Sequence, residues 1–301
     1  YRCTYCMPAE GFAFLPRPHL LTFEELKRIV GVLVGLGIRK IRLTGGEPLI
    51  RRDISVLIAG LARIEGVEDL AMTTNAHRLG PLAQGLADAG LRRVNVSLDD
   101  VDPDVFRDLT RGGDLAKVLD GIARARAAGL GVKLNAVVVA GVNDDAPLRI
   151  VRHFADQPEI EIRFIETMPF ERVDRSRRHV SARSIREQLG ELEPLPPPLH
   201  AGPATRFRLP SGQVVGFVSP ITEHFCQACN RLRLQADGHL RTCLSREAEP
   251  SLRDVLRSGI DDTALEQLLR RRVWGKVAGH EAHLDGEGFR SFDGAMTSVG
   301  G

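Results

Sequence analysis

Five cysteines occur in two compact groups, and both groups have the spacing of metal or iron–sulfur ligands. Cys3 and Cys6 lie three residues apart at the amino end, and Cys226 and Cys229 repeat that spacing ahead of Cys243. Two thiolates so spaced can bind one metal ion or cluster from a tight loop. An odd number of clustered cysteines argues against a disulfide framework and for bound metal in a reducing compartment.

The second cysteine group supports two interpretations. Three thiolates leave one iron of a four-iron cluster without a protein ligand, and such an iron can bind a substrate atom. Alternatively, the three cysteines bind a structural zinc ion together with His224 or His239, which lie nearby in the sequence. The spacing favours neither interpretation, because cysteine pairs of this kind are also common in zinc sites.

A basic run, Asn230-Arg231-Leu232-Arg233, follows the second cysteine pair directly. In a strand, Arg231 and Arg233 face the same side. Two guanidinium groups beside a metal site suit a phosphate or carboxylate ligand. An isolated Arg-x-Arg is more often the solvated face of a strand, so this run alone does not assign a ligand.

Strands and helices alternate through the first part of the chain, which predicts parallel βαβ units. Thr22 and Glu25 form a capping-box pattern at the start of the first helix. No GxGxxG follows the first strand, which weakens a dinucleotide-binding interpretation. The sequence predicts strands at 38–44, 69–74, 93–98, 132–139 and 161–166, and helices at 20–35, 54–64, 79–89, 115–128 and 146–155.

Polar residues recur where the predicted strands end, and the alternation stops after about Met168. In a barrel, the carboxyl ends of all strands meet around one site, so we expect a full or partial barrel over residues 1–170. Residues 171–301 form a C-terminal extension with a predicted hairpin (206–209 and 214–218) and helices at 252–257 and 263–272. The strand-end residues are Thr44, Thr74, Ser97, Asp99, Asn135 and Glu166.

The overall composition restricts the class of protein. The 301 residues carry a formal net charge of only +2, which is too balanced to indicate a nucleic-acid or membrane partner. No apolar run approaches the ~20 residues of a membrane span, and no secretory segment is visible. We expect a cytoplasmic protein, and both a monomer and a homodimer are compatible with the sequence.

These motifs resemble a known family. Residues Tyr1 to Pro8 resemble the latter part of the CxxxCxxC motif of the radical S-adenosylmethionine superfamily, and Thr44-Gly45-Gly46-Glu47-Pro48 resembles its GGE motif. The second cysteine group, the basic run and the closing Gly300-Gly301 resemble one branch, the GTP 3′,8-cyclase (MoaA) family of molybdenum cofactor biosynthesis. The resemblance covers nearly the whole chain.

The resemblance implies a partial (β/α)6 TIM-like barrel whose first strand precedes Tyr1, with a second iron–sulfur cluster in the C-terminal extension. One 4Fe–4S cluster is expected on Cys3, Cys6 and a cysteine two residues before Tyr1, so the present chain is expected to hold it weakly. The other 4Fe–4S cluster is expected on Cys226, Cys229 and Cys243 and to bind guanine.

The implied reaction is a radical cyclisation of GTP, in the lyase class. One electron cleaves S-adenosylmethionine to a 5′-deoxyadenosyl radical, which takes hydrogen from the ribose 3′ carbon of GTP. The sugar radical then attacks carbon 8 of guanine and gives 3′,8-cyclo-7,8-dihydro-GTP. The resemblance implies a low-potential electron donor and the next enzyme of the pathway as partners, and it assigns no catalytic side chain.

The resemblance also implies the binding residues, with Glu47 shaping the GGE loop. Cationic side chains in a low-dielectric cavity suit a triphosphate. The residues implied for S-adenosylmethionine are Tyr5, Gly46, Ser97 and Met168; those implied for GTP are Arg42, Thr73, Lys133, Arg163, Arg231, Leu232 and Arg233.

The sequence departs from the family at two further positions. Ala76 stands where the family usually has glycine, and Gly294 stands where an arginine that supports turnover is expected, which puts the function of the tail in question. Two other hypotheses remain: a different radical S-adenosylmethionine enzyme with an auxiliary cluster, and a non-catalytic, zinc-stabilised barrel that binds nucleotides. Other radical S-adenosylmethionine enzymes with an auxiliary cluster tend to carry more C-terminal cysteines than this chain does. Iron and sulfide analysis would distinguish a zinc-stabilised barrel from both radical enzymes.

Overall fold

A single mixed sheet organises the chain. The computed structural model describes residues 1–11, 14–168, 180–197, 202–223, 225–226, 229–244, 248–276, 284–285 and 288–289. The first five strands and β8 are parallel, and β8, β7 and β6 continue the sheet as antiparallel neighbours. In spatial order the strands are β1 (Lys40–Leu43), β2 (Asp69–Thr74), β3 (Arg93–Ser97), β4 (Gly131–Val138), β5 (Glu161–Glu166), β8 (Val214–Val218), β7 (Thr205–Arg208) and β6 (Glu193–Leu195).

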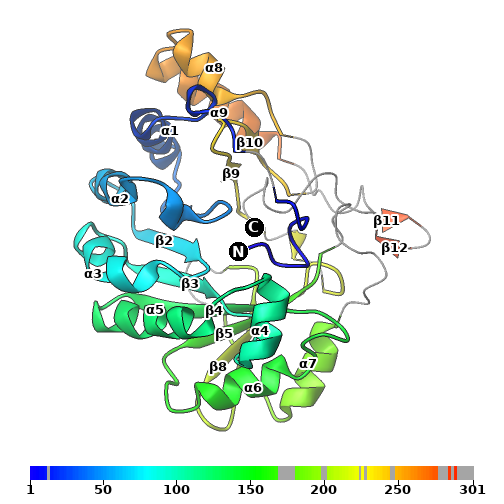
Figure 1. Cartoon of the computed structure of the whole chain (residues 1–301). Helices are drawn as coiled ribbons and strands as arrows, with labels where there is room; N and C mark the ends of the chain where they lie inside the picture. Colours follow the sequence, from blue (N-terminus) through cyan, green and yellow to red (C-terminus); the bar gives the residue numbers. More distant parts are fainter. Residues whose placement is uncertain are drawn as a thin grey trace.

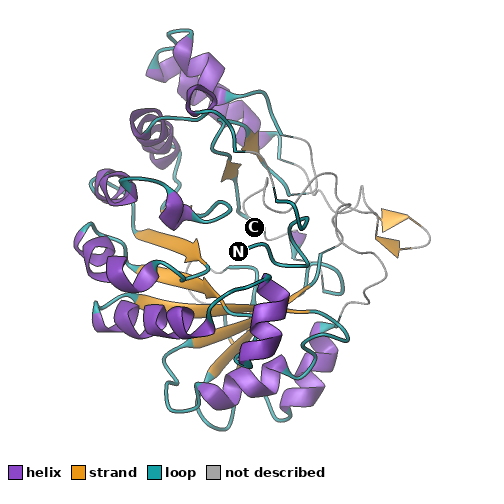
Figure 2. Cartoon of the chain, in the orientation of Figure 1, coloured by secondary structure: helices purple, strands orange, loops and turns teal. Residues whose placement is uncertain are grey.

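Helices α1 to α7 lie along one face of this curved sheet, and the amino terminus of the chain lies on the other side (Figure 1). Figure 2 shows the resulting alternation of strand and helix, which confirms the predicted βαβ pattern. The helices are α1 (Phe23–Gly35), α2 (Ile54–Ala62), α3 (Leu79–Asp88), α4 (Pro103–Thr110), α5 (Leu115–Ala127), α6 (Ala146–His153), α7 (Ala182–Leu189), α8 (Leu252–Arg257) and α9 (Asp262–Trp274).

Local sequence signals explain most of these boundaries. The predicted capping box begins α1, because the Thr22 hydroxyl accepts from the Glu25 N–H and the Glu25 carboxylate accepts from the Thr22 N–H. Helix α4 was not predicted, although Asp102 accepts from the N–H groups of Asp104 and Val105 and Pro103 occupies the first turn. That cap was the signal that could have revealed α4.

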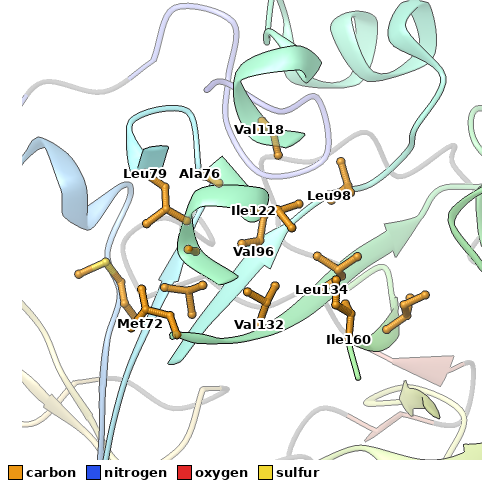
Figure 3. Packing of buried hydrophobic residues seen from close by; sticks show 14 of the residues in the cluster. Met72, Ala76, Leu79, Val96, Leu98, Val118, Ile122, Val132, Leu134 and Ile160 are labelled. Atoms are coloured by element: carbon orange, nitrogen blue, oxygen red, sulfur yellow. The ribbon is translucent and has the colours of Figure 1, made fainter. Parts of the chain in front are cut away.

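The strands have one face buried under the helices and one face open to the barrel interior. In β4, residues at even positions are buried and those at odd positions are only partly covered, which is the period of two expected for a strand. Figure 3 shows Val132 and Leu134 of β4 packed with Val96 and with Ile122 of α5. The buried face therefore fixes which side chains line the interior.

A second apolar cluster joins the C-terminal segment to the barrel. Leu21 and the α1 residues Ile29 and Leu33 pack with Leu240 of β10 (Leu240–Arg241) and with leucines of α8 and α9. Leu232 and Leu234 of the adjoining β9 segment (Arg233–Leu234) are partly buried against this cluster. Helix α1 thus holds β9 and β10 beside the open edge of β1.

The sheet continues past residue 170, because β8 pairs with β5. The remaining short elements are two 3-10 helices, η1 (Arg17–His19) and η2 (Pro48–Ile50), and a small hairpin of β11 (Leu284–Asp285) and β12 (Gly288–Phe289). Over the described part of the chain, every helix is too short or too polar to cross a membrane.

Candidate functional site

The first cysteine pair lies on a loop, residues 1–8, that is fastened to α4. The Thr4 N–H donates to the Leu109 carbonyl at 2.9 Å. The Arg111 guanidinium, just after α4, donates to the carbonyls of Arg2 and Met7 at 2.8 Å each. The unpredicted helix α4 therefore positions the cysteine loop.

Tyr5 anchors the same loop to the interior. Its buried hydroxyl donates to Asp99 Oδ2 at 2.7 Å, while Asp99 Oδ1 accepts from the Val137 N–H at 2.9 Å. The Asn143 amide donates to the Asp99 carbonyl at 2.8 Å. Burial raises the pKa of Asp99 to about 6, although the hydrogen bonds from Val137 and Tyr5 oppose this shift.

Cys3 and Cys6 are close enough to serve as two ligands of one cluster. The N–H groups of Cys6 and Met7 both donate to the Cys3 carbonyl at 3.1 Å, which closes the turn between the cysteines. A hydrogen bond between the two thiols raises the pKa of Cys3, with burial, and lowers the pKa of Cys6. Two adjacent thiols, one of them readily ionised, fit the donor set of an iron–sulfur cluster. The third ligand, upstream of Tyr1, stays a prediction.

The GGE loop after β1 is held by Glu47. Its Oε1 accepts from the Leu49 N–H at 3.0 Å and from the Thr74 hydroxyl at 2.7 Å, and its Oε2 accepts from the Asn75 N–H at 2.8 Å. Glu47 therefore joins the loop to the carboxyl end of β2. This arrangement is consistent with the loop-shaping role expected of Glu47.

The four residues expected to bind S-adenosylmethionine come from four segments at the same end of the sheet. Tyr5 lies on the cysteine loop, Gly46 follows β1, Ser97 ends β3 and Met168 follows β5. Asn135 pairs in register with Ser97, and its buried Oδ1 has no hydrogen-bond partner among the described residues. An unpartnered acceptor at this position fits a polar cofactor that brings its own donors.

Four of the residues expected to bind GTP share the interior face of the sheet: Arg42 on β1, Thr73 on β2, Lys133 on β4 and Arg163 on β5. The side chain of Arg42 is accessible to solvent, but the protein groups gathered around it desolvate the guanidinium, and with the positive charges of Arg93, Arg163 and Arg231 they lower its pKa to about 10, so it remains a cation at neutral pH. Cationic side chains from strands that are far apart in the sheet therefore lie on the same interior face.

One buried carboxylate organises part of this cationic face. Glu161, at the start of β5, binds Lys133 at 2.9 Å and Arg163 at 2.6 Å, and Arg206 of β7 lies 3.4 Å from it. Burial opposes ionisation of Glu161, but the charges of Arg163 and Lys133 outweigh it and lower the pKa of its carboxyl. Glu161 consequently holds these three cations in place on the interior face.

The second cysteine group lies at the C-terminal side of the interior. The Cys229 N–H donates to the Cys226 carbonyl at 3.1 Å. The Lys276 ammonium donates to the carbonyls of Cys229 and Arg231 at 2.7 and 2.8 Å and lies 3.5 Å from the Cys229 sulfur. Burial raises the pKa of Cys229, but a hydrogen bond and the charge from Arg231, with Lys276, outweigh it and bring the value to about 7. This thiol is suited to be a metal ligand.

The basic run adjoins these cysteines. Burial and the charge of Arg231 lower the pKa of Arg233 to about 10, while Cys229 and Cys243 oppose that shift, so Arg233 lies close to both cysteines. The Arg231 guanidinium lies 4.9 Å above the Phe225 ring. Strand β9 begins only at Arg233, so Arg231 precedes the strand in which we expected the two arginines to share a face.

The candidate metal ligands do not converge on a common point. Among the described residues, no group of three or more histidine, cysteine, aspartate or glutamate side chains is arranged to hold a metal ion. His239 Nδ1 lies 3.0 Å from Asp237 Oδ1, and His224 lies outside the described residues, as do Gly294, Gly300 and Gly301. The support for a cluster at the second cysteine group therefore comes from the chemistry of its thiols and from their proximity to Arg233.

Glu166 connects the two parts of the site. Its carboxylate accepts from the N–H of Ala182, which begins α7, at 2.9 Å, and from the N–H groups of Ile221 and Thr222 at 3.2 and 3.1 Å. These bonds fix the segment that leads to Cys226 against the end of β5.

Sequence reasoning missed the roles of Glu161 and Lys276. Glu161 and Arg163 lie two residues apart and therefore on the same face of a strand, which could have indicated the ion pair between them. Nothing local indicated Lys276, because its partners lie about 45 residues earlier and meet it only through packing of α9.

Two family models match consecutive parts of the chain. The Radical SAM superfamily matches residues 1–154, and Molybdenum Cofactor Synthesis C matches residues 160–282. The boundary between them falls just before β5. The interior cations Arg42 and Lys133 belong to the first match, and Arg163 and Arg231 to the second.

Curated relatives match the chain along nearly its whole length. The GTP 3′,8-cyclase of Paracoccus denitrificans is 44% identical over 292 residues, which cover 93% of this chain and 83% of the relative. The GTP 3′,8-cyclase of Moorella thermoacetica is 44% identical over 306 residues, covering 100% and 93%.

Among solved structures, Streptococcus suis SuiB matches with a TM-score of 0.61 over 90% of this chain and 64% of that protein. The sequence identity is 14%, so this likeness bears on the fold alone.

Proposed function

This chain belongs to the GTP 3′,8-cyclase family of the radical S-adenosylmethionine superfamily, and on that premise we propose that it converts GTP to 3′,8-cyclo-7,8-dihydro-GTP. The observation that carries the proposal is the meeting of interior cations from both halves of the chain beside the second cysteine group. After desolvation, the positive charges of Arg93, Arg163 and Arg231 are the causes that lower the pKa of Arg42, and cations gathered in this way are unfavourable unless a polyanion binds among them.

The two ends of the interior have different chemistry, which gives the substrate an orientation. Cys3, Cys6, Gly46 and Ser97 lie at the carboxyl ends of the strands, whereas Lys133 and Glu161 lie near the amino ends of β4 and β5. The triphosphate is therefore proposed to lie toward the amino ends, and the sugar toward the cysteine loop.

Cys3 and Cys6 would hold the first 4Fe–4S cluster with a cysteine upstream of Tyr1, and Cys226, Cys229 and Cys243 would hold the second. When bound, the first cluster and S-adenosylmethionine supply the radical chemistry. The residues of this chain supply position, because Tyr5 and Glu47 fix the loops that carry the cysteine pair and Gly46.

The remaining assignments follow from this proposal. Tyr5, Gly46, Ser97 and Met168 contact S-adenosylmethionine, and the enzyme belongs to the lyase class. It takes electrons from a low-potential donor and passes its product to the next enzyme of molybdenum cofactor synthesis. The residues proposed to contact GTP are Arg42, Thr73, Lys133, Arg163, Arg231, Leu232 and Arg233.

An anaerobic assay tests the function directly. The full-length enzyme, loaded with iron and sulfide, reduced, and mixed with S-adenosylmethionine and GTP, should form 5′-deoxyadenosine together with a cyclised nucleotide. Replacing GTP by ATP should abolish the cyclised product. Formation of 5′-deoxyadenosine without any change in GTP would contradict the proposed substrate.

Nucleotide binding provides a second test that does not require turnover. Arg231→Ala and Arg233→Ala should each weaken GTP binding by roughly tenfold, the loss of one charge-assisted contact, and leave the iron content unchanged. Arg270→Ala is the matched control, since Arg270 pairs with Glu266 on the exposed surface of α9. Equal GTP affinity in all three variants would refute the assigned role of the basic run.

A further inference from the structure

A cleft outside the barrel has no role in the function described so far. It has a volume of about 990 Å³ and lies where α2, α3 and α5 begin. Helices begin at the same end of the sheet at which the parallel strands end, so the cleft opens on the same rim of the barrel as the cysteine loop. Its lining includes Ile50, Arg52, His77, Arg78, Leu82 and Lys117.

The cleft is lined by exposed apolar side chains and by arginine side chains that have no ion-pair partner among the described residues. Ile50 is 51% exposed and Leu82 is 39% exposed. Arg52 and Arg78 are exposed, and neither has an ion-pair partner within the part of the chain that the structure describes. Apolar contacts surrounded by positive charge are suited to a protein partner whose surface is negative.

The acidic residues around the cleft do not cancel this charge. Asp120 is engaged by Arg124 at 2.9 Å, and Lys117 is engaged by Asp114 at 3.5 Å. Asp53 is the remaining acid in the lining. Arg52 and Arg78 together outweigh Asp53, so the charge available to a partner is net positive.

The cleft is directly connected to the first cysteine loop. His77 Nδ1 lies 3.1 Å from the Tyr1 hydroxyl, and the two rings meet edge to face with their centroids 5.5 Å apart. Tyr1 is two residues from Cys3. A protein seated in the cleft would thus be separated from the first cluster site by His77, Tyr1 and a short length of backbone.

The backbone beside the cleft is also strained. Three non-glycine residues of the described chain have a left-handed backbone, and two of them, Asp53 (φ 57°) and Ala76 (φ 58°), border the cleft. Such conformations are unfavourable for residues other than glycine and persist where the surrounding structure imposes them, often at binding surfaces.

We propose that this cleft is the docking surface for an acidic one-electron carrier protein that reduces the first cluster. The inference rests on the proposed function, because radical cleavage of S-adenosylmethionine consumes one electron per event. The carrier is oxidised by one electron and the cluster is reduced by one electron. No atom or proton passes between the two proteins.

Charge reversal tests the surface. The experiment uses the full-length, cluster-loaded enzyme with reduced flavodoxin, a small acidic flavoprotein, as the probe, and with dithionite as a small reductant that needs no docking surface. In the variant Arg52→Glu/Arg78→Glu, cluster reduction by flavodoxin at low salt should slow by at least about tenfold. Reduction by dithionite should be unchanged.

The matched control carries the same charge change elsewhere. Arg63 follows α2 at its opposite end and Arg92 precedes β3, and both are exposed. Arg63→Glu/Arg92→Glu should leave the flavodoxin rate within about twofold of wild type. The affinity for oxidised flavodoxin, measured by titration, should fall only in the cleft variant, and added salt should reduce the difference between the variants.

Each outcome decides the question. Equal flavodoxin rates and affinities in the two double variants would overturn the proposal, as would a failure of flavodoxin to bind or reduce the wild type. Equal slowing with dithionite would also overturn it, since the arginines would then act on the cluster itself. If flavodoxin reduction depends on the cleft but GTP is not cyclised, the docking surface stands and the proposed substrate fails.

Discussion

The Tyr5 hydroxyl donates a 2.7 Å hydrogen bond to Asp99, and this bond joins the cysteine loop to the end of β3. Both groups are buried. The carboxylate also accepts from the Val137 N–H, so the pair connects the loop with two neighbouring strands. The precision of the first cluster site depends on this contact.

Removing that hydroxyl should loosen the loop. Tyr5→Phe deletes a hydrogen bond to a buried carboxylate, and we expect a loss of about 1.5–3 kcal/mol in unfolding free energy. Urea denaturation of the metal-free protein measures it. Tyr1→Phe is the control, because its partly buried bond to His77 should be worth about 1 kcal/mol. Equal effects of the two substitutions would contradict the anchoring role.

The buried Asp99 should make stability depend on pH. Its folded-state pKa of about 6 exceeds the ordinary value of 3.8. The folded state therefore favours the protonated carboxyl, and the stabilisation present below about pH 4 is lost as the pH rises through 6, by about 3 kcal/mol in total. Asp99→Asn should show a smaller decline than wild type between pH 4 and pH 7. Parallel stability curves for the two proteins would contradict this assignment.

Glu161 should have the opposite pH dependence. Lys133 and Arg163 lower its pKa, so its stabilisation is present above the ordinary glutamate pKa and is lost as the pH falls through the lower folded-state value. At pH 7, Glu161→Gln should cost about 2 kcal/mol, less than the ~3–5 kcal/mol for a fully buried pair because the cations are partly exposed. Glu193→Gln, at the partly exposed pair with Arg208, should cost less than about 1 kcal/mol. Thermal unfolding at pH 7 and at acidic pH compares them.

Lys276 should support the second cluster. Lys276→Met removes the donor to two carbonyls and a sulfur of the Cys229–Arg231 segment. We expect iron bound at the second site to fall severalfold, within the ~10–100-fold range for partners that orient metal ligands. Iron analysis after anaerobic desalting measures the loss, Lys276→Arg should restore part of it, and Lys117→Met serves as a control. Full loading of Lys276→Met would exclude this role.

Ala76 should tolerate glycine, the residue that the family resemblance implies at this position. Its left-handed backbone costs about 1–2 kcal/mol for an alanine, but glycine forfeits a buried methyl worth about 0.8 kcal/mol and adds ~0.4–1 kcal/mol of unfolded-state entropy. Ala76 is fully buried, so Ala76→Gly should change unfolding free energy by less than about 1 kcal/mol. Chemical denaturation tests this expectation, and a loss above about 3 kcal/mol would show that the methyl has a packing role.

Local patterns predicted the barrel well because its elements carry strong local signals. Apolar runs gave β2 and β5 with the correct ends. The Thr22–Glu25 capping box was identified correctly, although the predicted helix began at Leu20 and α1 begins at Phe23. Helix α4 was missed because its eight residues contain two acids and one arginine, and only the Asp102 cap and Pro103 mark its start. The cysteine groups and the GGE loop were visible as motifs.

The contacts between distant segments could not be predicted from local patterns. Arg42 and Arg231 are neighbours only because α8 and α9 pack on α1. The pairing of Glu161 with Arg206 likewise depends on β8 adding to the sheet beside β5 and on β7 returning next to it. These relationships arise from topology.

The leucine-rich contact between α1 and the helices α8 and α9 has an evolutionary consequence. Arg42 belongs to the part of the chain shared with a large superfamily, whereas Arg231 belongs to the part shared with cofactor-synthesis proteins. If both arginines bind GTP as proposed, substrate choice depends on the contact between the barrel and the extension and not on either part alone. To transfer this extension to another barrel, one would also have to transfer the surface of α1 that contacts it, including Ile29 and Leu33. Only then could that barrel bind the same substrate.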